Sequence, residues 1–563
     1  MKSIIILLLL ACGCVPPLAL RDQALATSTS GMVVSAERHA TQAGVEMLRR
    51  GGHAVDAAIA VAFALAVTWP EAGNLGGGGF MHIREATGDA LVVDYREKAP
   101  AAADPKMFLD ASGNVDPDRV RLGFVVAGVP GTIAGLARAH ELFGELPWRD
   151  LVEPAIRLAR DGFTIDERIA APLRAIAKEM TRFPATAAIF YPAGKPLSAG
   201  QTLVQPDLAA VLEAVAADPR AFYEGPLATR MAERMHAEGG LWTAADLAAY
   251  RPVVRPPLRI RFHELTLLAP PPPSSAGVAL GQMLGMLEED DLRALGQNSP
   301  ATLHLLAEVM RRAFLERALH LGDADFVAVD IAGLLSRERT RALRATIAPD
   351  HASKSVDLAP AGLLAAPPDG NTTHFSVVDG EGNAVSNTYT LEESYGSRAV
   401  LPGFGFLLNN ELHDFNVKPG TTDDKGLIGT PPNTIAPGKR PLSSMAPCFV
   451  ERDGQLVGLL GSPGGRTIIN TVLQVFLNLF VFDMTPAAAV SAPRIHHQWM
   501  PDVLRAEEAL SIATRATLRT LGHAVETPPP PGAWGHANTI VRGKDGAWTG
   551  AVDPRRGGHA EGP

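Results

Sequence analysis

The segment PPDGNTTHFSVVDGEGNAVSNTYT, residues 367–390, passes abruptly from a loop-like composition into the alternation of a β-hairpin. Residues 379–383 are rich in Gly, Asp and Asn, which favour turns, so they predict a five-residue connection. The flanking segments 372–378 and 384–390 then form two antiparallel strands. A loop therefore ends at a strand that opens with two threonines, Thr372 and Thr373.

The length of the turn sets the register of this hairpin. Pairing symmetric about Glu381 places Val378 opposite Ala384 and Thr372 opposite Thr390. Strand alternation predicts one small or polar face, formed by Thr372, His374, Ser376, Ser386, Thr388 and Thr390. The opposite face carries Phe375, Val377, Val385, Tyr389 and Leu391, with Asn387 as its polar exception.

Thr372 has two interpretations. In the first it is an ordinary residue at a loop-to-strand boundary, where Asn and Thr are common, and the NTT triplet also matches a glycosylation sequon. In the second it becomes a new N-terminus and a nucleophile. A threonine hydroxyl needs a base, and the sequence contains no G-x-S-x-G nucleophile elbow. Cleavage of the Asn371–Thr372 bond would supply an α-amine, whose reference pKa is about 7.7–8.0.

The segment before Thr372 suits such a cleavage. Residues 350–371 are dominated by Ala, Pro, Asp, Gly and Ser, a composition typical of a flexible surface linker that is easily cut. The hydroxyl of Thr372 can attack the carbonyl of Asn371 and pass through an ester. Residues 21–371 and 372–563 would then become a large and a small subunit.

The N-terminal segment MKSIIILLLLACGC predicts export. One Lys precedes a short apolar run that ends at small residues, so residues 1–20 are typical of a signal peptide, too short to span a bilayer. The sequence around Cys12 also resembles a bacterial lipoprotein processing site, so the alternatives are a periplasmic protein and a lipoprotein anchored through Cys12. Beyond this segment the chain contains only Cys448, which argues against a disulfide within the body of the protein and excludes a cysteine-ligated metal site there.

Composition limits the class of protein. The chain has 563 residues, of which 46% are hydrophobic and 20% charged, as in globular proteins with a large core. The net charge of −9 argues against a nucleic-acid partner. A helix is predicted at residues 36–50, with Ser35 as its N-cap. A second helix is predicted at residues 54–69, where a nearly uniform apolar surface indicates burial. Residues 130–349 are predicted to be mostly helical and the C-terminal part mostly strands, which suits layered α and β elements.

The chain also carries groups that suit a zwitterion, all but one of them in its second half. The arginine in DYREKAP and a serine pair could bind a carboxylate, two acids could bind an ammonium, and a Gly-Gly pair before a helix could stabilise an oxyanion. Each signal alone is weak, since such residues are usually solvated surface pairs or turns. These candidates are Arg96, Ser443, Ser444, Glu411, Asp414, Gly464 and Gly465.

Several long motifs then identify a family. Between about residues 33 and 554 the chain resembles the γ-glutamyltranspeptidases, also called glutathione hydrolases, of the N-terminal-nucleophile hydrolase superfamily. The motifs that carry the resemblance are GNLGGGGF, DYREKAP, AGVPGTIAG, PPPSS, TTHFSVVD, GNAVSNTYTL, LLNNELHDF, KRPLSSMAP, GSPGGRTII and APRIHHQW.

The resemblance implies an α+β fold, a four-layer αββα sandwich made as a precursor that cleaves itself between Asn371 and Thr372, whose two subunits stay paired. It implies a γ-glutamyl ester on Thr372, formed from glutathione or a related γ-glutamyl compound and resolved by water or an amino-acid or peptide acceptor. Neither a metal nor an organic cofactor is expected. The residue roles that it suggests are Thr372 as nucleophile; Thr390 as supporting hydroxyl; Arg96, Ser443 and Ser444 for the substrate carboxylate; Glu411 and Asp414 for the amino group; and Gly464 and Gly465 for the oxyanion.

Two positions depart from the family pattern. Glu392 stands where relatives have Asn or an acid, so a substrate contact is expected there with less support. Lys425 aligns with an aromatic residue that covers the pocket in some members, which leaves closure and the balance between hydrolysis and transfer open. The alternatives are a cephalosporin or glutaryl acylase of the same fold and an unprocessed lipoprotein that binds peptides.

Overall fold

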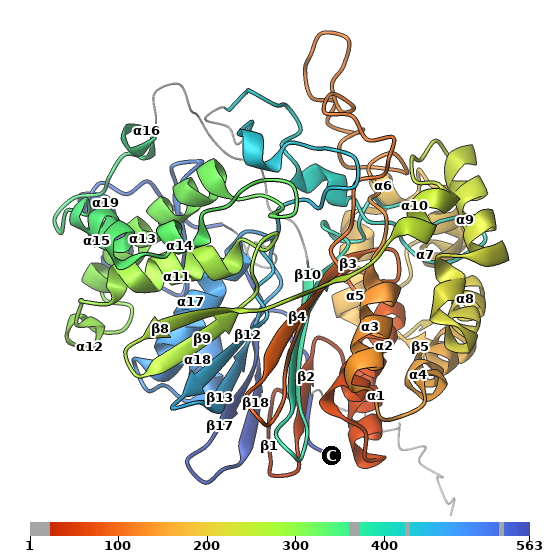
Figure 1. The fold of residues 1–563 in the computed structure, drawn as a ribbon, viewed down its shortest axis with the longest axis horizontal. Helices are drawn as coiled ribbons and strands as arrows, with labels where there is room; N and C mark the ends of the chain where they lie inside the picture. The colour runs from red at the N-terminus through yellow and green to blue at the C-terminus, as the bar shows by residue number, and fades with distance from the viewer. Residues whose placement is uncertain (1–22, 360–371, 423–427, 529–533) are drawn as a thin grey trace, which may run out of the picture.

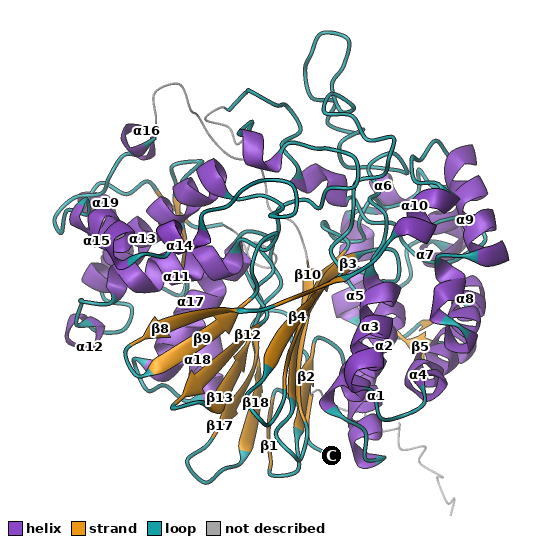
Figure 2. Ribbon diagram, in the orientation of Figure 1, coloured by secondary structure: helices purple, strands orange, loops and turns teal. Residues whose placement is uncertain are grey.

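The computed structural model describes residues 23–359, 372–422, 428–528 and 534–563. The predicted signal peptide with Cys12, the residue Asn371 and the residue Lys425 lie outside the described residues. Two β-sheets lie face to face, and helices cover the outer face of each (Figure 1, Figure 2). The predicted αββα sandwich is therefore confirmed.

The first sheet contains the hairpin at its centre. Its seven strands, in spatial order, are β19 (His559–Glu561), β2 (Met32–Ser35), β10 (Thr372–Val378), β11 (Ala384–Thr390), β3 (Gly78–Arg84), β4 (Ala90–Asp94) and β7 (Val253–Arg255). All neighbouring pairs are antiparallel. Strands from before and after Thr372 are therefore interleaved in one hydrogen-bonded sheet.

The second sheet is also antiparallel and has seven strands. In spatial order they are β1 (Leu25–Ser28), β18 (Trp548–Val552), β17 (Asn538–Arg542), β13 (Gln455–Leu460), β12 (Cys448–Arg452), β9 (Leu265–Ala269) and β8 (Leu258–Phe262). Short strands lie outside the two sheets: β5 (Phe163–Thr164) pairs with β6 (Thr202–Leu203), and β14 (Ile495–His496), β15 (Leu504–Ala506) and β16 (Val525–Glu526) form a small sheet.

The helices form the two outer layers (Figure 2). On the side of the first sheet lie α1 (Arg38–Arg49), α2 (Ala54–Thr68), α3 (Thr132–Phe143), α4 (Trp148–Asp161), α5 (Glu167–Ala175), α6 (Ala177–Met180), α7 (Pro184–Phe190), α8 (Pro206–Ala217), α9 (Gly225–Ala237) and α10 (Ala244–Ala249). On the side of the second lie α11 (Ala276–Leu287), α12 (Leu292–Leu295), α13 (Pro300–His320), α14 (Ile331–Leu334), α15 (Arg337–Ala345), α16 (Ser355–Leu358), α17 (Thr467–Phe480), α18 (Pro486–Ser491) and α19 (Ile512–Thr520).

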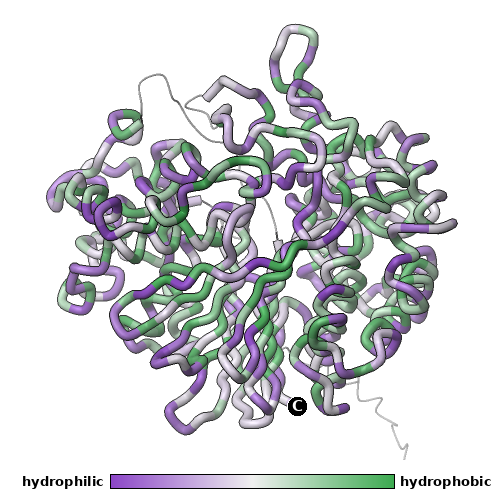
Figure 3. The backbone as a smooth tube through the Cα atoms, viewed as in Figure 1, coloured by the Kyte–Doolittle hydropathy of each residue, from purple (hydrophilic) through white to green (hydrophobic). Residues whose placement is uncertain are grey.

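Three apolar clusters lie between these layers and hold them together. One joins α1 and α2 to the outer face of the first sheet, a second joins α11, α13 and α17 to the second sheet, and a third lies between the sheets. Hydrophobic residues are concentrated along the strands and the helices that flank them (Figure 3). Burial of this surface, at about 25 cal/mol per Å², is the main force that holds the layers together.

The predicted buried helix is α2, in which every residue is buried. A capping box starts it: the His53 ring accepts a hydrogen bond from a helical N–H, and the Asp56 carboxylate accepts from the N–H of His53. No helix in the described part of the chain combines the length and apolarity that a bilayer crossing requires. The predicted Ser35 cap of α1 is wrong: Glu37 caps that helix, because β2 extends through Ser35 and leaves the next turn to Glu37.

The predicted linker 350–371 is only partly described. Residues 350–359 are described and contain α16, whose first residue, Ser355, is fully buried. The Ser355 N–H donates to an Asp502 carboxylate oxygen at 2.8 Å, and the Trp499 ring N–H donates to the Ser355 carbonyl at 3.0 Å. This part of the linker is therefore anchored to the C-terminal half of the chain. Residues 360–371 lie outside the described residues.

Candidate active site

The register predicted for the hairpin is confirmed. Thr372 pairs with Thr390 and Val378 with Ala384, with all seven residue pairs in step. The Thr372 hydroxyl donates to the Thr390 hydroxyl oxygen, with 3.4 Å between the Oγ1 atoms. The backbone N–H of Glu392 donates to the same Thr390 oxygen at 2.8 Å. Thr390 is thus held with its oxygen toward Thr372.

The histidine closest in sequence to Thr372 is bound elsewhere. The His374 ring lies 2.8 Å from the Thr388 hydroxyl and 3.1 Å from the Ser376 hydroxyl, along the same small and polar face. Burial, reinforced by the charge of His536, lowers the pKa of His374 to about 3. A neutral imidazole with both nitrogens engaged by these hydroxyls does not act on Thr372. This face of the described hairpin therefore supplies no side-chain base for Thr372. That agrees with the interpretation in which Thr372 becomes a new N-terminus and its own α-amine is the base.

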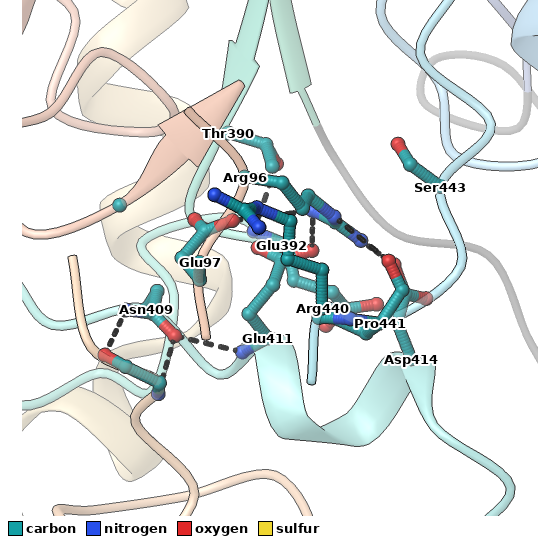
Figure 4. A network of polar contacts seen from close by, with 12 residues as sticks. Arg96, Glu97, Thr390, Glu392, Asn409, Glu411, Asp414, Arg440, Pro441 and Ser443 are labelled. Atoms are coloured by element: carbon teal, nitrogen blue, oxygen red, sulfur yellow. Dashed lines mark hydrogen bonds and ion pairs between the residues drawn. The ribbon is translucent and has the colours of Figure 1, made fainter. Parts of the chain in front are cut away.

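Arg96 lies at the centre of a buried cluster of acids (Figure 4). It follows β4, and its guanidinium forms ion pairs with Glu411 and, at 2.5 Å, with Asp414. A third contact, to Glu97, measures 3.4 Å. Although burial opposes its charge, Glu411, Glu97 and Asp414 together raise the pKa of Arg96. Residues predicted to bind opposite ends of a zwitterion therefore bind each other here.

Glu411 is, like Glu97, fully buried. It opens the short helix η3 (Glu411–Asp414), and its backbone N–H donates to the Asn409 side-chain oxygen at 3.0 Å. Its second carboxylate oxygen, Oε2, has no hydrogen-bond partner among the described residues. Burial raises the pKa of Glu411 well above its usual value, against the opposing charge of Arg96. An unpartnered buried carboxylate oxygen is costly, and a cationic group that donates a hydrogen bond to Oε2 would remove this cost.

Glu392 adds another buried carboxylate. Its backbone adopts φ = +78°, a conformation unfavourable for a non-glycine residue. Its Oε2 lies 3.6 Å from Nδ1 of His413, and burial raises the pKa of Glu392 to about 7. The neighbouring Glu393 could complete a metal-ligand set with these two residues, but Arg121 holds both of its oxygens at 2.7 Å.

Ser443 and Ser444 are held by the PPPSS turn. The Ser443 N–H donates to the Pro273 carbonyl at 2.8 Å, and the Ser275 hydroxyl donates to the Ser443 carbonyl at 2.6 Å. The Ser443 hydroxyl oxygen accepts from the N–H of Met445 at 3.1 Å. Its hydrogen therefore has no acceptor among the described residues and is available to a ligand.

The Gly-Gly pair precedes α17 in backbone conformations that favour glycine. Gly464 has φ = +125° and Gly465 has φ = +54°. A Cβ atom on Gly464 would lie 2.5 Å from the Thr467 hydroxyl and 3.0 Å from the Cα of Gly535. Neither N–H of the pair donates to another described residue. Two backbone N–H groups of this kind can stabilise an oxyanion.

A single pocket brings these groups together. All the predicted catalytic and substrate-binding residues line it except Gly464, which directly precedes a lining residue. The lining is Arg96, Thr372, Thr390, Glu392, Glu411, Asp414, Ser443, Ser444, Met445, Gly465, Arg466 and Ile468. Arg466 was missed by the sequence analysis, although it directly follows the Gly-Gly pair in GSPGGRT and could have been found there.

Comparisons with known proteins agree with this geometry. The family model described as "Gamma-glutamyltranspeptidase" matches residues 40–562. The glutathione hydrolase proenzyme of Escherichia coli (strain K12) is 43% identical over 93% of this chain and 90% of its own. The acylase ACY 1 proenzyme of Pseudomonas sp. (strain V22) is 37% identical over 94% of this chain and 92% of its own. The structure of cephalosporin acylase from Bacillus halodurans superimposes with a TM-score of 0.85 at 25% identity, covering 96% of this chain and 97% of that one. The chain belongs to the gamma-glutamyltranspeptidase family.

Proposed function

We propose that this protein is a γ-glutamyl hydrolase and transferase that cleaves the γ-glutamyl amide of glutathione and related compounds. The observation that carries the proposal is the hydroxyl pair of Thr372 and Thr390, which lies on the wall of a pocket lined by both acids and a guanidinium. Family membership supports an enzyme of this class.

Maturation begins with the Thr372 hydroxyl. Its oxygen attacks the carbonyl carbon of Asn371, the peptide C–N bond breaks, and the nitrogen takes up the proton that the hydroxyl loses and leaves as the α-amine of Thr372. Water then hydrolyses the resulting ester, which leaves a carboxylate on Asn371 and a free hydroxyl on Thr372. The Thr390 oxygen at 3.4 Å orients the attacking hydroxyl.

The same hydroxyl then attacks the donor. The new α-amine takes the proton from Oγ1, Oγ1 adds to the γ-carbonyl carbon, and the N–H groups of Gly464 and Gly465 stabilise the oxyanion. The leaving amine takes the proton from the ammonium, and a γ-glutamyl ester remains on Thr372. Water, or the amine of an amino acid or peptide acceptor, resolves the ester.

The charges around the pocket suit a γ-glutamyl donor. Its α-ammonium can replace Arg96 as the partner of Glu411 and Asp414, while its α-carboxylate takes the released guanidinium and the serine hydroxyls. The ion pairs of Arg96 with Glu411 and Asp414 are thereby replaced by ion pairs of each of these groups with the donor. A glutaryl group has no ammonium and would leave Glu411 without a new partner.

The two pieces remain together after cleavage. Strand β10, which would begin the small subunit, pairs with β2, and β11 pairs with β3. Because β2 and β3 belong to the large subunit, separation would break a continuous sheet and expose its core. We infer that residues 21–371 and 372–563 form a stable heterodimer, exported under the direction of residues 1–20. Mass spectrometry of the mature N-terminus tests both export and lipidation at Cys12.

The acylase relatives support a second candidate function. Electrophoresis tests the self-cleavage that both candidates share, and an anilide assay separates the two. Denaturing electrophoresis should give two fragments that join at Asn371–Thr372, with Thr372→Ala giving one. The purified protein should then release p-nitroaniline from the γ-glutamyl anilide faster than from the glutaryl anilide. The reverse preference supports the acylase, and an active single fragment contradicts both enzymes.

A further inference from the structure

Arg317 is a buried cation that no acid of the described residues neutralises by direct contact. It lies in the last turn of α13 and is 8% exposed. Its Nε donates to the Ser275 hydroxyl at 2.8 Å and its Nη2 to the Ser444 hydroxyl at 3.3 Å. Among the described residues no carboxylate forms an ion pair with it. A charge in this position is costly unless an anion compensates it.

The other buried arginines of the same helix differ. Arg311 and Arg312 each form an ion pair with Glu308, and Arg311 forms a second with Asp502. Burial, reinforced by the charges of Arg466 and Arg96, lowers the pKa of Arg317 to about 9, against the favourable charge of Asp414. Within the described structure, Arg311 and Arg312 thus form ion pairs with acids, whereas Arg317, which contacts the pocket wall, does not.

The contact with Ser444 gives this charge a direction. Because the Ser444 oxygen accepts a hydrogen bond from the guanidinium, the Ser444 hydrogen must point to another acceptor. No described residue provides one. Ser443 repeats the arrangement, with its oxygen accepting from the N–H of Met445. Two hydroxyls on the pocket wall are therefore arranged as donors, and Arg317 polarises one of them.

Arg317 also fixes the backbone beneath these serines. The Ser275 oxygen that accepts from Nε donates its own hydrogen to the Ser443 carbonyl at 2.6 Å. One guanidinium therefore holds the serine pair through two routes, the Ser444 hydroxyl and the Ser443 carbonyl. Arg96, in contrast, is already surrounded by Glu97, Glu411 and Asp414, so the local charge around it is negative.

We propose that Arg317 is a positioning residue for the donor's α-carboxylate. It sets the Ser444 hydroxyl as a donor and supplies the uncompensated positive charge that the carboxylate meets. The inference rests on the proposed γ-glutamyl activity and names a determinant of that site's specificity. Removing the guanidinium should weaken ligands that carry an α-carboxylate and spare those that lack it.

The test is Arg317→Gln in the mature enzyme, assayed with γ-glutamyl p-nitroanilide. We expect KM to rise roughly 10- to 100-fold, the effect of a lost hydrogen bond to a charged group, with kcat changing less than about 3-fold. Competitive inhibition separates the two ends of the donor, since 4-aminobutanoate is glutamate without its α-carboxylate. Arg317→Gln should raise the inhibition constant of glutamate by the same factor and leave that of 4-aminobutanoate within about 2-fold.

Matched variants control for stability. Arg312→Gln removes a buried arginine from the same helix, away from the pocket, and should not separate the two inhibitors. If Arg317→Gln fails to mature, Ser275→Ala keeps the guanidinium but removes the acceptor of Nε, and should raise the glutamate constant alone by about 2- to 5-fold. Equal losses for both inhibitors, or no loss, overturn the role of Arg317. Absence of γ-glutamyl turnover in the unsubstituted enzyme overturns the proposed function instead.

Discussion

The Oγ1 atoms of Thr372 and Thr390 lie 3.4 Å apart because the hairpin turn places the two residues directly opposite each other. Thr390 receives a second hydrogen bond from the N–H of Glu392, so its oxygen is fixed before any substrate binds. Orientation of the nucleophile is thus built into the backbone register.

Thr390→Ala should slow both self-cleavage and turnover by about 100-fold, the order that a positioned proton-transfer partner contributes. Thr390→Ser keeps the oxygen and should retain most of the activity. Electrophoresis over time and steady-state kinetics measure the two effects. Equal defects in the Ala and Ser variants would show that the methyl group, and not the hydroxyl, is what Thr390 contributes.

Gly464→Ala should reduce kcat by roughly 100-fold, because displacement of one oxyanion donor costs about that much. The added Cβ would lie 2.5 Å from the Thr467 hydroxyl, so the loop must move. Gly454→Ala is the control: this glycine has φ = +77° with no atom near its Cβ, so the substitution introduces backbone strain far from the site. A similar loss of kcat in both variants would assign the effect to stability.

The affinity for the donor should depend on pH through Glu392. Because burial raises its pKa to about 7, this carboxyl loses its charge as the pH falls below 7, and KM for γ-glutamyl p-nitroanilide should rise. Glu392→Gln should remove this limb of the KM profile. The Thr372 α-amine also titrates, but it acts on kcat and should remain visible in the variant. An unchanged KM profile in Glu392→Gln would contradict the assignment.

The hairpin could be predicted from sequence because its signals are local: the turn sets the pairing, and alternation sets the faces. The contacts of Arg96 with Glu411 and Asp414 could not be predicted in this way, because they join residues more than 300 positions apart and depend on how the fold buries them together. Arg317 was missed for a related reason. Nearly every residue of α13 is buried, so no polar face distinguishes it from its neighbours. The predicted Ser35 cap was wrong because Ser35 is the last residue of strand β2, so α1 begins later and Glu37 caps it.

The anchor of residues 350–359 should contribute measurable stability. Asp502 forms an ion pair with Arg311 and accepts from the Ser355 N–H. Breaking a buried pair costs about 3–5 kcal/mol, but Asp502 is 33% exposed, so we expect Asp502→Asn to lower the free energy of unfolding by about 2 kcal/mol.

This contribution of Asp502 has a defined pH dependence. Although burial acts in the opposite direction, the hydrogen bond with His497 and the charge of Arg311 hold the pKa of Asp502 well below its ordinary 3.8. A depressed folded-state pKa means that the stabilisation is present above pH 3.8 and is lost as the pH falls below it. Denaturant unfolding of the mature enzyme at neutral and acidic pH should therefore show the difference between Asp502→Asn and the unsubstituted enzyme shrinking in acid. Asp483→Asn, which breaks an exposed pair with Arg293, should change neither curve. A difference that persists unchanged in acid would mean that the Asp502→Asn substitution acts through packing and not through the lost charge pair with Arg311.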